Sequence, residues 1–255
     1  MSENFKKSLN IYICHYTKYT KRKEYIKNQL NKLKLNPNNI HFIEKYDAGD
    51  YDQKINEKIF LDLKVGNNYD LSREKASWYA RKSKPRILKD SEKSLALKHL
   101  DALKKIKDSS SDYGLVIEDD CYFCDDFLKK LELVVKNLPQ NWNVYIANST
   151  INMLNNKGLN RIIADNNYVI RRKHPSTAGT VSYLIKKKSA EMVYYDIKKN
   201  KISWPMDWEY NWLFKKLSFN NYYNRSEKPL IYCAQFEDNI NTNNSNSYSC
   251  VMIKI

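Results

Sequence analysis

The chain has 255 residues, of which 42% are hydrophobic and 13% aromatic, with only 5 Gly and 6 Pro. This composition supports a folded domain with a sizeable core and excludes collagen-like, linker-like and glycine-rich repeat proteins. A total of 44 Lys and Arg against 29 Asp and Glu gives a net charge of +15. That excess favours anionic partners, such as nucleic acid, a membrane surface or a phosphorylated small molecule.

The beginning of the chain, MSENFKKSLNIYICHYTK, lacks the continuous apolar run of a signal peptide. No stretch approaches the roughly 18 apolar residues of a transmembrane helix. We therefore expect a cytoplasmic location. The five cysteines have no framework-like spacing, which is typical of reduced thiols in that compartment. Cys121 and Cys124 form a C-x-x-C pair, for which a redox or zinc role is the alternative interpretation.

The first 48 residues predict a strand, a helix and a second strand. Residues 8–17 are β-branched and aromatic, and residues 21–35 place apolar side chains at helical spacing. Asn36-Pro37 ends this helix, and residues 39–48 predict the next strand. A strand, helix and strand in this order predict a parallel sheet with covering helices, and therefore an α/β fold.

The next part of the chain predicts a loop region, a helix and a central strand. Residues 48–85 are polar and basic, which favours loops and short helices. Residues 89–109 carry an apolar stripe at helical spacing, with Asp90 or Ser91 as the expected N-cap. Leu115, Val116 and Ile117 form a short apolar run, which is typical of a buried central strand.

The remaining elements follow without an internal repeat or a linker, so we expect one domain over residues 1–255. In chain order the sequence predicts a helix at 125–138, strands at 141–148, 167–172 and 180–185, a helix at 187–199, a strand at 229–235 and a flexible tail at 238–250, with an aromatic stripe at helical spacing at 204–217.

Three adjacent carboxylates, Glu118, Asp119 and Asp120, follow the predicted central strand. Ligands gather beyond the carboxyl ends of strands in open α/β sheets. The three groups repel one another unless a cation offsets their charge, and oxygen ligands suit Mg²⁺ or Mn²⁺. We interpret them as a metal site that would bridge two phosphates of a nucleotide. The alternative is an acidic turn before the next helix.

Asp207 and Glu209 lie in a second candidate region, which is dense in aromatic residues. Aromatic rings beside carboxylates can grip the faces and hydroxyls of a sugar, although an aromatic stripe at helical spacing is also typical of a core. Among the histidines, His15 follows the first strand on the expected ligand face. His99 on the helix at 89–109 has the pattern of a half-buried structural residue, and His174 could join a metal.

Four blocks of sequence together resemble glycosyltransferase family 25, which includes bacterial lipooligosaccharide galactosyltransferases and procollagen galactosyltransferases. The blocks are NIYICHYTKYTKRKEYIKNQL, SLALKHLDALKKI with YGLVIEDD, STAGTVSYLIKKKSAEMV, and WPMDWEYNW with KPLIYCAQ, in this order along residues 9–236. The sequence departs from the family at three places. Lys98-His99 replaces a Ser-His pair, residues 48–90 match nothing, and FEDNINTNNSNS replaces a Gly-rich close.

The resemblance implies a GT-A type fold, with a Rossmann-like mixed sheet flanked by helices. In that fold, residues 1–125 or so form the nucleotide-sugar-binding half, and residues 126–255 or so form the acceptor-binding half. It also implies an inverting transfer of galactose or glucose from a UDP-sugar. The acceptor is then a hydroxyl of a glycan, as in lipopolysaccharide biosynthesis, or a hydroxylysine of a collagen-like protein.

The resemblance also assigns roles to individual residues. Glu118, Asp119 and Asp120 would hold Mn²⁺, or Mg²⁺, against the UDP diphosphate. The residues expected on the nucleotide side are His15, Thr17, Arg22, His99 and Asp119.

Asp207 matches the family's Pro-x-Asp carboxylate near the acceptor. An inverting transfer needs a carboxylate base within hydrogen-bond reach of the acceptor hydroxyl, and we expect Asp207 in this role with Glu209 as the reserve. Two other functions stay open at this point. One is a basic nucleic-acid-binding protein, which the absence of a recognised nucleic-acid motif disfavours. The other is a catalytically idle binding module on the same fold.

Overall fold

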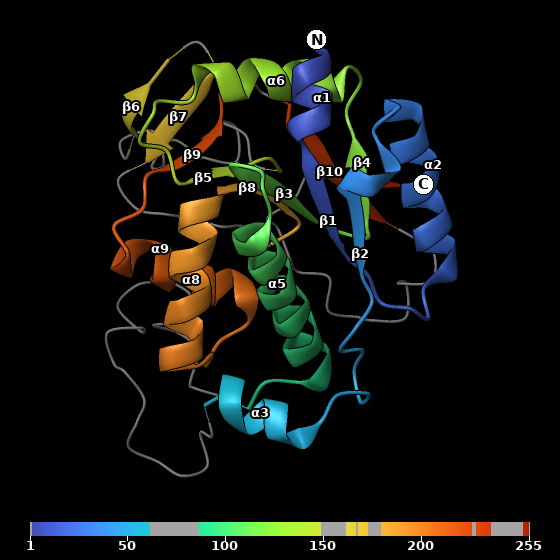
Figure 1. The fold of residues 1–255 in the computed structure, drawn as a ribbon, viewed down its shortest axis with the longest axis vertical. Helices are drawn as coiled ribbons and strands as arrows, with labels where there is room; N and C mark the ends of the chain where they lie inside the picture. The colour runs from blue at the N-terminus through green and yellow to red at the C-terminus, as the bar shows by residue number, and fades with distance from the viewer. Residues whose placement is uncertain are drawn as a thin grey trace.

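The computed structural model describes residues 2–61, 87–148, 162–166, 168–172, 180–225, 228–235 and 252–254. Its centre is an eight-stranded mixed sheet with the strand order β2-β1-β3-β8-β5-β9-β7-β6 (Figure 1). A three-stranded sheet, β11-β10-β4, lies beside it. Strands from both expected halves of the chain share the large sheet.

The strands are β1 (Asn10–Cys14), β2 (Ile40–Ile43), β3 (Tyr113–Glu118), β4 (Cys121–Phe123), β5 (Val144–Ile146), β6 (Ile162–Asp165), β7 (Val169–Arg172), β8 (Ser182–Lys186), β9 (Asn221–Asn224), β10 (Ile231–Gln235) and β11 (Met252–Lys254). The helices are α1 (Glu3–Ser8), α2 (Thr20–Leu33), α3 (Gln53–Ile59), α5 (Asp90–Asp108), α6 (Phe127–Asn137), α8 (Lys187–Asn200) and α9 (Met206–Lys216), with a 3₁₀ turn, η1, at Pro37–Asn39.

The predicted strand, helix and strand at the start of the chain are confirmed. Strand β1 pairs in parallel with β2 on one side and with β3 on the other, and α2 connects β1 to β2. Strand β8 then pairs antiparallel with both β3 and β5, which makes the sheet mixed. The expected fold class, a mixed sheet flanked by helices, is therefore confirmed.

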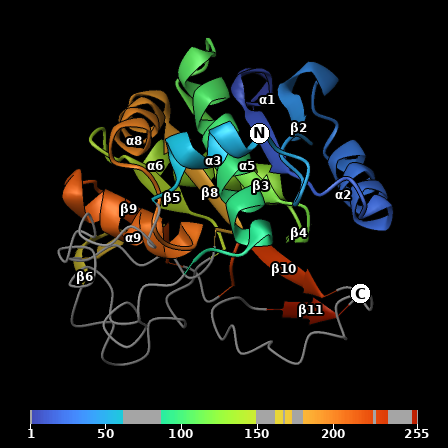
Figure 2. The ribbon, with the colours of Figure 1, turned by 90° about the horizontal axis from the view of Figure 1, so that it is seen from below.

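Helices cover both faces of the large sheet, because alternate residues of its central strands are apolar on both sides. Ile11 and Ile13 of β1 point into a core that includes residues of α1, α2 and α6. Tyr12 and Cys14 point into a second core built with α5, α8 and α9. Helices α5 and α8 lie side by side on this second face (Figures 1 and 2).

Some predicted boundaries are corrected by the structure. Helix α5 begins at Asp90, but its N-cap is Lys89, whose backbone N–H donates to the Glu92 carboxylate at 2.9 Å. The second strand ends at Ile43, earlier than expected. Helix α1 and strands β4, β6, β9 and β11 were not predicted. The predicted tail at 238–250 lies outside the described residues.

The region expected to hold loops and short helices contains α3, and Phe60 just after it pairs with Ile202 in a parallel bridge. Residues 62–86 of that region lie outside the described part of the chain. Within the ranges that the structure describes, no helix is long and apolar enough to cross a membrane.

Candidate active site

The candidate site begins where two parallel strands end. Cys14, the last residue of β1, pairs with Glu118, the last residue of β3. The next residue of each strand therefore emerges at the same edge of the sheet, and these residues are His15 and Asp119. The parallel pairing thus places the loop after β1 against the carboxylates after β3, at the edge where α/β sheets bind ligands.

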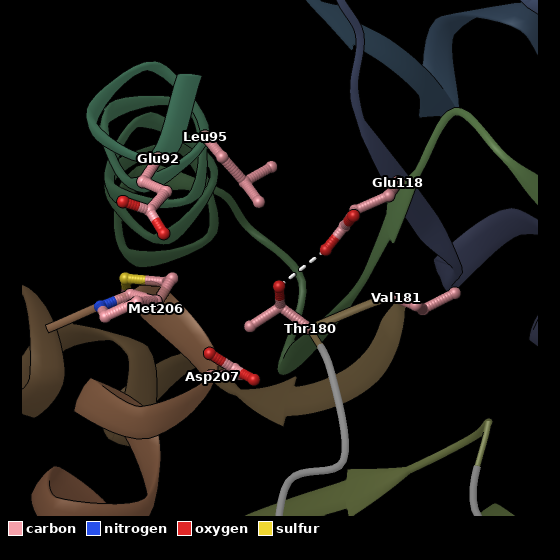
Figure 3. Close-up of a pocket in the computed structure, with 8 residues that line it drawn as sticks. Glu92, Leu95, Glu118, Thr180, Val181, Met206 and Asp207 are labelled. Atoms are coloured by element: carbon pink, nitrogen blue, oxygen red, sulfur yellow. Dashed lines mark hydrogen bonds between the residues drawn. The ribbon is translucent and has the colours of Figure 1, made fainter. Parts of the chain in front are cut away.

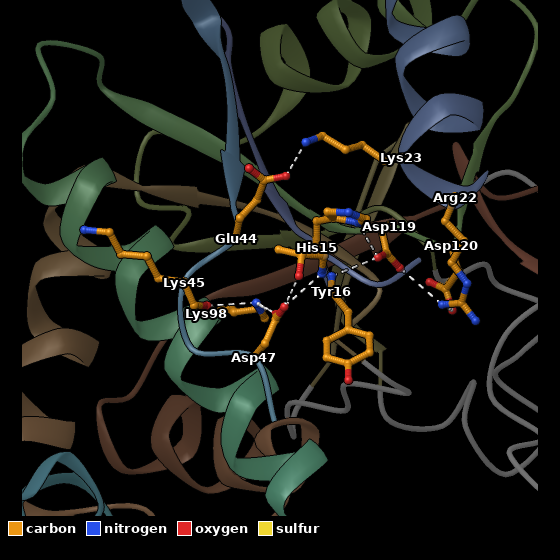
Figure 4. Close-up of polar contacts among 11 residues, drawn as sticks. His15, Tyr16, Arg22, Lys23, Glu44, Lys45, Asp47, Lys98, Asp119 and Asp120 are labelled. Carbon is orange, nitrogen blue, oxygen red and sulfur yellow. Dashed lines mark hydrogen bonds and ion pairs between the residues drawn. The ribbon is translucent and has the colours of Figure 1, made fainter. Parts of the chain in front are cut away.

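Asp119 joins the loop after β1 to the start of α2 (Figure 4). Its Oδ2 lies 2.7 Å from Nδ1 of buried His15 and accepts a hydrogen bond from the Tyr16 backbone N–H at 3.2 Å. Its Oδ1 accepts from the Arg22 guanidinium at 3.2 Å. Both carboxylate oxygens of Asp119 are therefore engaged by protein donors, which hold the loop after β1 in place.

Asp120 is in a different environment from Asp119. Its Oδ2 lies 4.0 Å from Arg22 and 3.7 Å from the Cys233 thiol. Its Oδ1 is buried and has no hydrogen-bond partner among the described residues. Burial and the neighbouring Glu118 carboxylate raise the pKa of Asp120 to about 7, although the Arg22 charge acts in the opposite direction. Asp120 is thus a half-buried carboxylate whose buried Oδ1 has no partner among the described residues and is available to a further cation.

These contacts test whether the residues fit a metal ion. Among the described residues, no group of three or more His, Cys, Asp and Glu side chains is placed to hold a metal. Asp119 is committed to protein donors, whereas the unpartnered Oδ1 of Asp120 suits a hard cation, for which carboxylate oxygens are preferred ligands. The fit therefore rests on Asp120, with Glu118 two residues away. His174, the other candidate, lies outside the described residues.

Glu118 connects the edge of the sheet to a buried polar chain. Its Oε1 accepts from the Thr180 hydroxyl at 2.5 Å and lies 3.6 Å from Nε2 of His99. His99 is fully buried, and its Nδ1 lies 3.1 Å from the Tyr183 hydroxyl. That hydroxyl bonds to the hydroxyl of Tyr210 at 2.8 Å. The structure therefore places His99 behind Glu118 in the core, away from any surface that a nucleotide could reach.

A cavity of about 220 Å³ lies between α5, the end of β3 and the start of α9. Three carboxylates line it, from Glu92, Glu118 and Asp207, and all three point toward the same space (Figure 3). The cavity thus brings together two carboxylates that the sequence had singled out separately, Glu118 and Asp207. Such a lining can accept hydrogen bonds from the hydroxyl groups of a sugar.

Asp207 stands in the first turn of α9 and accepts a hydrogen bond from the Trp208 backbone N–H at 2.9 Å. Burial raises its pKa to about 6, and the nearby Glu118 and Glu92 carboxylates act in the same direction, whereas the Trp208 hydrogen bond acts against them. A carboxylate with this pKa is a stronger base than an ordinary aspartate and is still mostly ionised near neutral pH.

Glu209 is fully buried and does not line the cavity. Its Oε2 accepts hydrogen bonds from the backbone N–H groups of Ser203 at 3.0 Å and Trp204 at 3.1 Å. These bonds fix the chain that leads into α9. The structure therefore gives Glu209 a structural role at this place and leaves Asp207 as the carboxylate at the cavity.

The sequence did not reveal one cluster of this region. Asp47 and Lys98 form a buried ion pair with 2.6 Å between Oδ1 and Nζ, and Oδ2 of Asp47 accepts from the backbone N–H of Thr17 at 3.1 Å (Figure 4). Burial pushes the pKa of Asp47 upward, but hydrogen bonds from Lys98 and Thr17 hold it below its ordinary value. The available signal was the position of Asp47 at the end of the strand predicted at residues 39–48.

The C-x-x-C pair does not form a joint site. Cys121 is buried in β4, and its thiol donates to the Val181 carbonyl at 3.2 Å. Cys124 is half-buried beyond the end of the same strand, and both are free thiols. Burial raises the pKa of Cys124, which makes its thiol a weaker nucleophile.

Comparisons with known proteins identify the class. The chain matches Glycosyltransferase family 25 (LPS biosynthesis protein) over residues 8–208, so it is a glycosyltransferase. Within that class it belongs to family 25, which confirms the resemblance seen in the sequence. No curated protein sequence matches the chain.

Two solved structures are similar to this chain at low identity. One is a glycosyltransferase involved in the glycosylation of the major capsid of PBCV-1, with 12% identity, a TM-score of 0.38, and coverage of 85% of this chain and 81% of that one. The other is the galactosyltransferase LgtC in complex with donor and acceptor sugar analogues, with 10% identity, a TM-score of 0.34, and coverage of 79% and 69%.

Proposed function

We propose that this enzyme moves a hexose, galactose or glucose, from a UDP-sugar to a hydroxyl of a glycan, with inversion at the anomeric carbon. The observation that carries the proposal is the cavity in which Asp207 from α9 and Glu118 from the end of β3 face the same space. Membership of a family described by lipopolysaccharide biosynthesis supports a glycan acceptor.

Asp207 is the general base in this proposal. An inverting transfer is a single in-line displacement, in which a carboxylate accepts the proton of the attacking hydroxyl. The pKa of about 6 makes Asp207 a better proton acceptor than an exposed aspartate. Its place in the cavity wall gives it access to an acceptor, which buried Glu209 lacks.

Asp120 and Glu118 are the carboxylates that we assign to Mn²⁺ or Mg²⁺. The unpartnered, buried Oδ1 of Asp120 supports this assignment. When bound, a divalent cation stabilises the negative charge that develops on a departing UDP. Asp119 does not contact the metal in this proposal. Its oxygens are engaged by His15, Tyr16 and Arg22, and it positions the loop on the nucleotide side.

The test is the release of UDP from a panel of UDP-sugars, with and without Mn²⁺ and in the absence of acceptor. Many transferases hydrolyse their donor slowly, so the acceptor need not be known. We expect release from one UDP-hexose, loss of release on chelation, and loss of release in Asp120→Ala. The matched control is Asp125→Ala, because Asp125 is an exposed carboxylate outside the cavity.

Silence across the panel would contradict the proposed use of a UDP-hexose as donor. A direct titration with UDP then separates an idle binding module, which still binds the nucleotide, from a protein that uses another donor. Product analysis with glycan acceptors and with a hydroxylysine peptide decides the acceptor class, and turnover of the peptide alone would contradict the glycan assignment.

A further inference from the structure

Lys98 occupies a place where the sequence departs from its family, and the structure shows what this lysine does. It lies on α5, on the face toward the site, and only 3% of its surface is exposed. Its ammonium group donates to Asp47 Oδ1 at 2.6 Å and to the Lys45 carbonyl at 2.8 Å (Figure 4). The side chain thus fixes the loop after β2 to a helix of the core.

Asp47 passes this restraint on to a second loop. While Oδ1 bonds to Lys98, Oδ2 accepts from both the backbone N–H and the hydroxyl of Thr17. Thr17 lies in the loop after β1, which also bears His15 and Tyr16. That loop is therefore held at two points, by Asp119 at one end of the candidate site and by the Lys98–Asp47 pair at the other.

A buried ion pair of this kind is not explained by stability alone. Removing two charges from water is unfavourable. A protein with a well-packed apolar pair of similar size in the same place is therefore often equally stable or more stable. What the ion pair supplies and an apolar pair lacks is directional hydrogen bonding to Thr17. The pair fixes the backbone of a loop that an apolar pair would leave unrestrained.

We propose that Lys98 is a positioning residue that acts through Asp47 and Thr17 to hold the loop at residues 15–19 ready for the UDP part of the donor. This inference rests on the proposed function. A loop that is ordered before the donor arrives loses little further freedom on binding, so the affinity is higher than for a mobile loop. Lys98 touches neither the cavity nor Asp207, so the chemical step does not depend on it directly.

The main test replaces the ion pair by an apolar pair, in the double variant Lys98→Met/Asp47→Leu. We expect its melting temperature to match or exceed that of the parent, because no unpaired charge is buried. We also expect UDP, titrated in the presence of Mn²⁺, to bind about ten-fold more weakly. In donor hydrolysis, KM should rise while kcat at saturating donor stays unchanged. Lys104→Met, an exposed lysine on the same helix, is the matched control and should bind as the parent does.

A second set of variants does not disturb the buried charges. Thr17→Val removes only the hydroxyl that donates to Asp47, and Thr17→Ser retains it. We expect the valine variant to bind UDP about three-fold more weakly and the serine variant to bind as the parent does. In the apolar-pair background, Thr17→Val should have no further effect, because its partner is already gone.

The outcomes separate the inference from the proposed function. A parent that binds no UDP overturns the proposed function and this inference with it. A parent that binds UDP, together with a folded apolar-pair variant that binds it equally well, overturns the inference alone. An equal loss from Thr17→Val in both backgrounds also overturns it, because Thr17 would then act on the donor directly. Should the apolar-pair variant not fold, the difference between Thr17→Val and Thr17→Ser decides.

Discussion

Asp207 and Asp120 are two half-buried carboxyl groups near the end of β3, and partial removal from water is the largest influence on the pKa of both. It raises the pKa of Asp207 to about 6 and that of Asp120 to about 7. Their partners differ, since Asp207 accepts a backbone hydrogen bond while Asp120 Oδ1 has no partner among the described residues. The first environment suits a base, and the second suits a carboxylate that binds a cation.

We expect Asp207→Asn to lower kcat by about 10²- to 10⁴-fold, because the amide cannot accept the proton of the acceptor hydroxyl. The KM for the donor should change by less than about three-fold, since the proposed function assigns Asp207 to the acceptor. Steady-state kinetics with Asp125→Asn as the control measure both values. A variant with the activity of the parent would remove Asp207 as the base.

The pH dependence of the parent follows from the same residue. The base must be ionised, and its raised pKa means that it takes up a proton at a higher pH than an ordinary aspartate does. Activity should therefore fall as the pH is lowered through about 6, the pKa of Asp207. A pH–rate profile from about pH 5 to about pH 8, which includes the expected midpoint of the fall in activity, checks this prediction. A flat profile there would contradict the assignment.

Asp120→Asn should stabilise the metal-free protein, because it removes one of three adjacent carboxylates. Of these three, Asp120 is the one with a buried oxygen that has no partner among the described residues. We expect a gain of roughly 1 kcal/mol in the free energy of unfolding without metal. Mn²⁺ should raise the melting temperature of the parent but not of the variant. Equal shifts in the two proteins, measured by thermal unfolding, would place the metal elsewhere.

Helices α5 and α9 bring the site together from two directions. Helix α5 carries Lys98 and His99, which lie behind two different parts of the site. Helix α9 carries Asp207 in its first turn and Tyr210 one turn later, and the hydroxyl of Tyr210 bonds to Tyr183 of β8. Each helix is thus anchored to the sheet by buried polar contacts close to the residues that it presents.

The approach of α5 to β3 is close enough to require a glycine. A Cβ on Gly114 would lie 2.6 Å from Ile106 Cγ1 and 2.8 Å from a ring carbon of Tyr12, and both side chains are buried. We expect Gly114→Ala to destabilise the protein by about 1–3 kcal/mol in chemical denaturation. Adding Ile106→Val, which removes a methyl group beside the new Cβ, should recover part of this loss. Full stability of Gly114→Ala would show that the helix shifts freely.

In the whole molecule, the loops of the candidate site and the cavity lie at one edge of a single mixed sheet. The loops after β1, β2 and β3 all leave the parallel part of the sheet at this edge. The connection between Lys98 and Asp47 ties two of these loops to the helical layer, across 51 positions in the sequence. The ion pair therefore connects distant parts of the chain beside the candidate site.

Acid should weaken this connection. The pKa of Asp47 is lowered in the folded protein, so the ion pair stabilises the fold above the ordinary value of 3.8 and this contribution is lost as the pH falls through the lower, folded-state pKa. The comparison runs from pH 5 to pH 3, roughly one unit on either side of the ordinary value of 3.8. Over this range the melting temperature should fall more for the parent than for Lys98→Met/Asp47→Leu. Parallel curves would show that Asp47 does not contribute.

The sequence determined the elements and the chemical inventory of the site, because both depend on local patterns. Helical and strand periodicities predicted α2, α5, α6 and α8 and the central strands. Glu118 to Asp120 were recognisable as acids directly after a buried strand. Strand β9 escaped prediction because Asn221 and Asn224 resemble turn residues, and only the neighbouring strands β5 and β7 make the segment part of the sheet.

The tertiary structure decided what each polar side chain faces, because that depends on partners far away in the sequence. It gave both oxygens of Asp119 to the loop after β1 and to α2, and left an oxygen of Asp120 without a partner among the described residues. It turned Glu209 toward backbone N–H groups and Asp207 toward the cavity. Adjacent residues of one chemical type have the same local signal, so only the packing around them assigns their different roles.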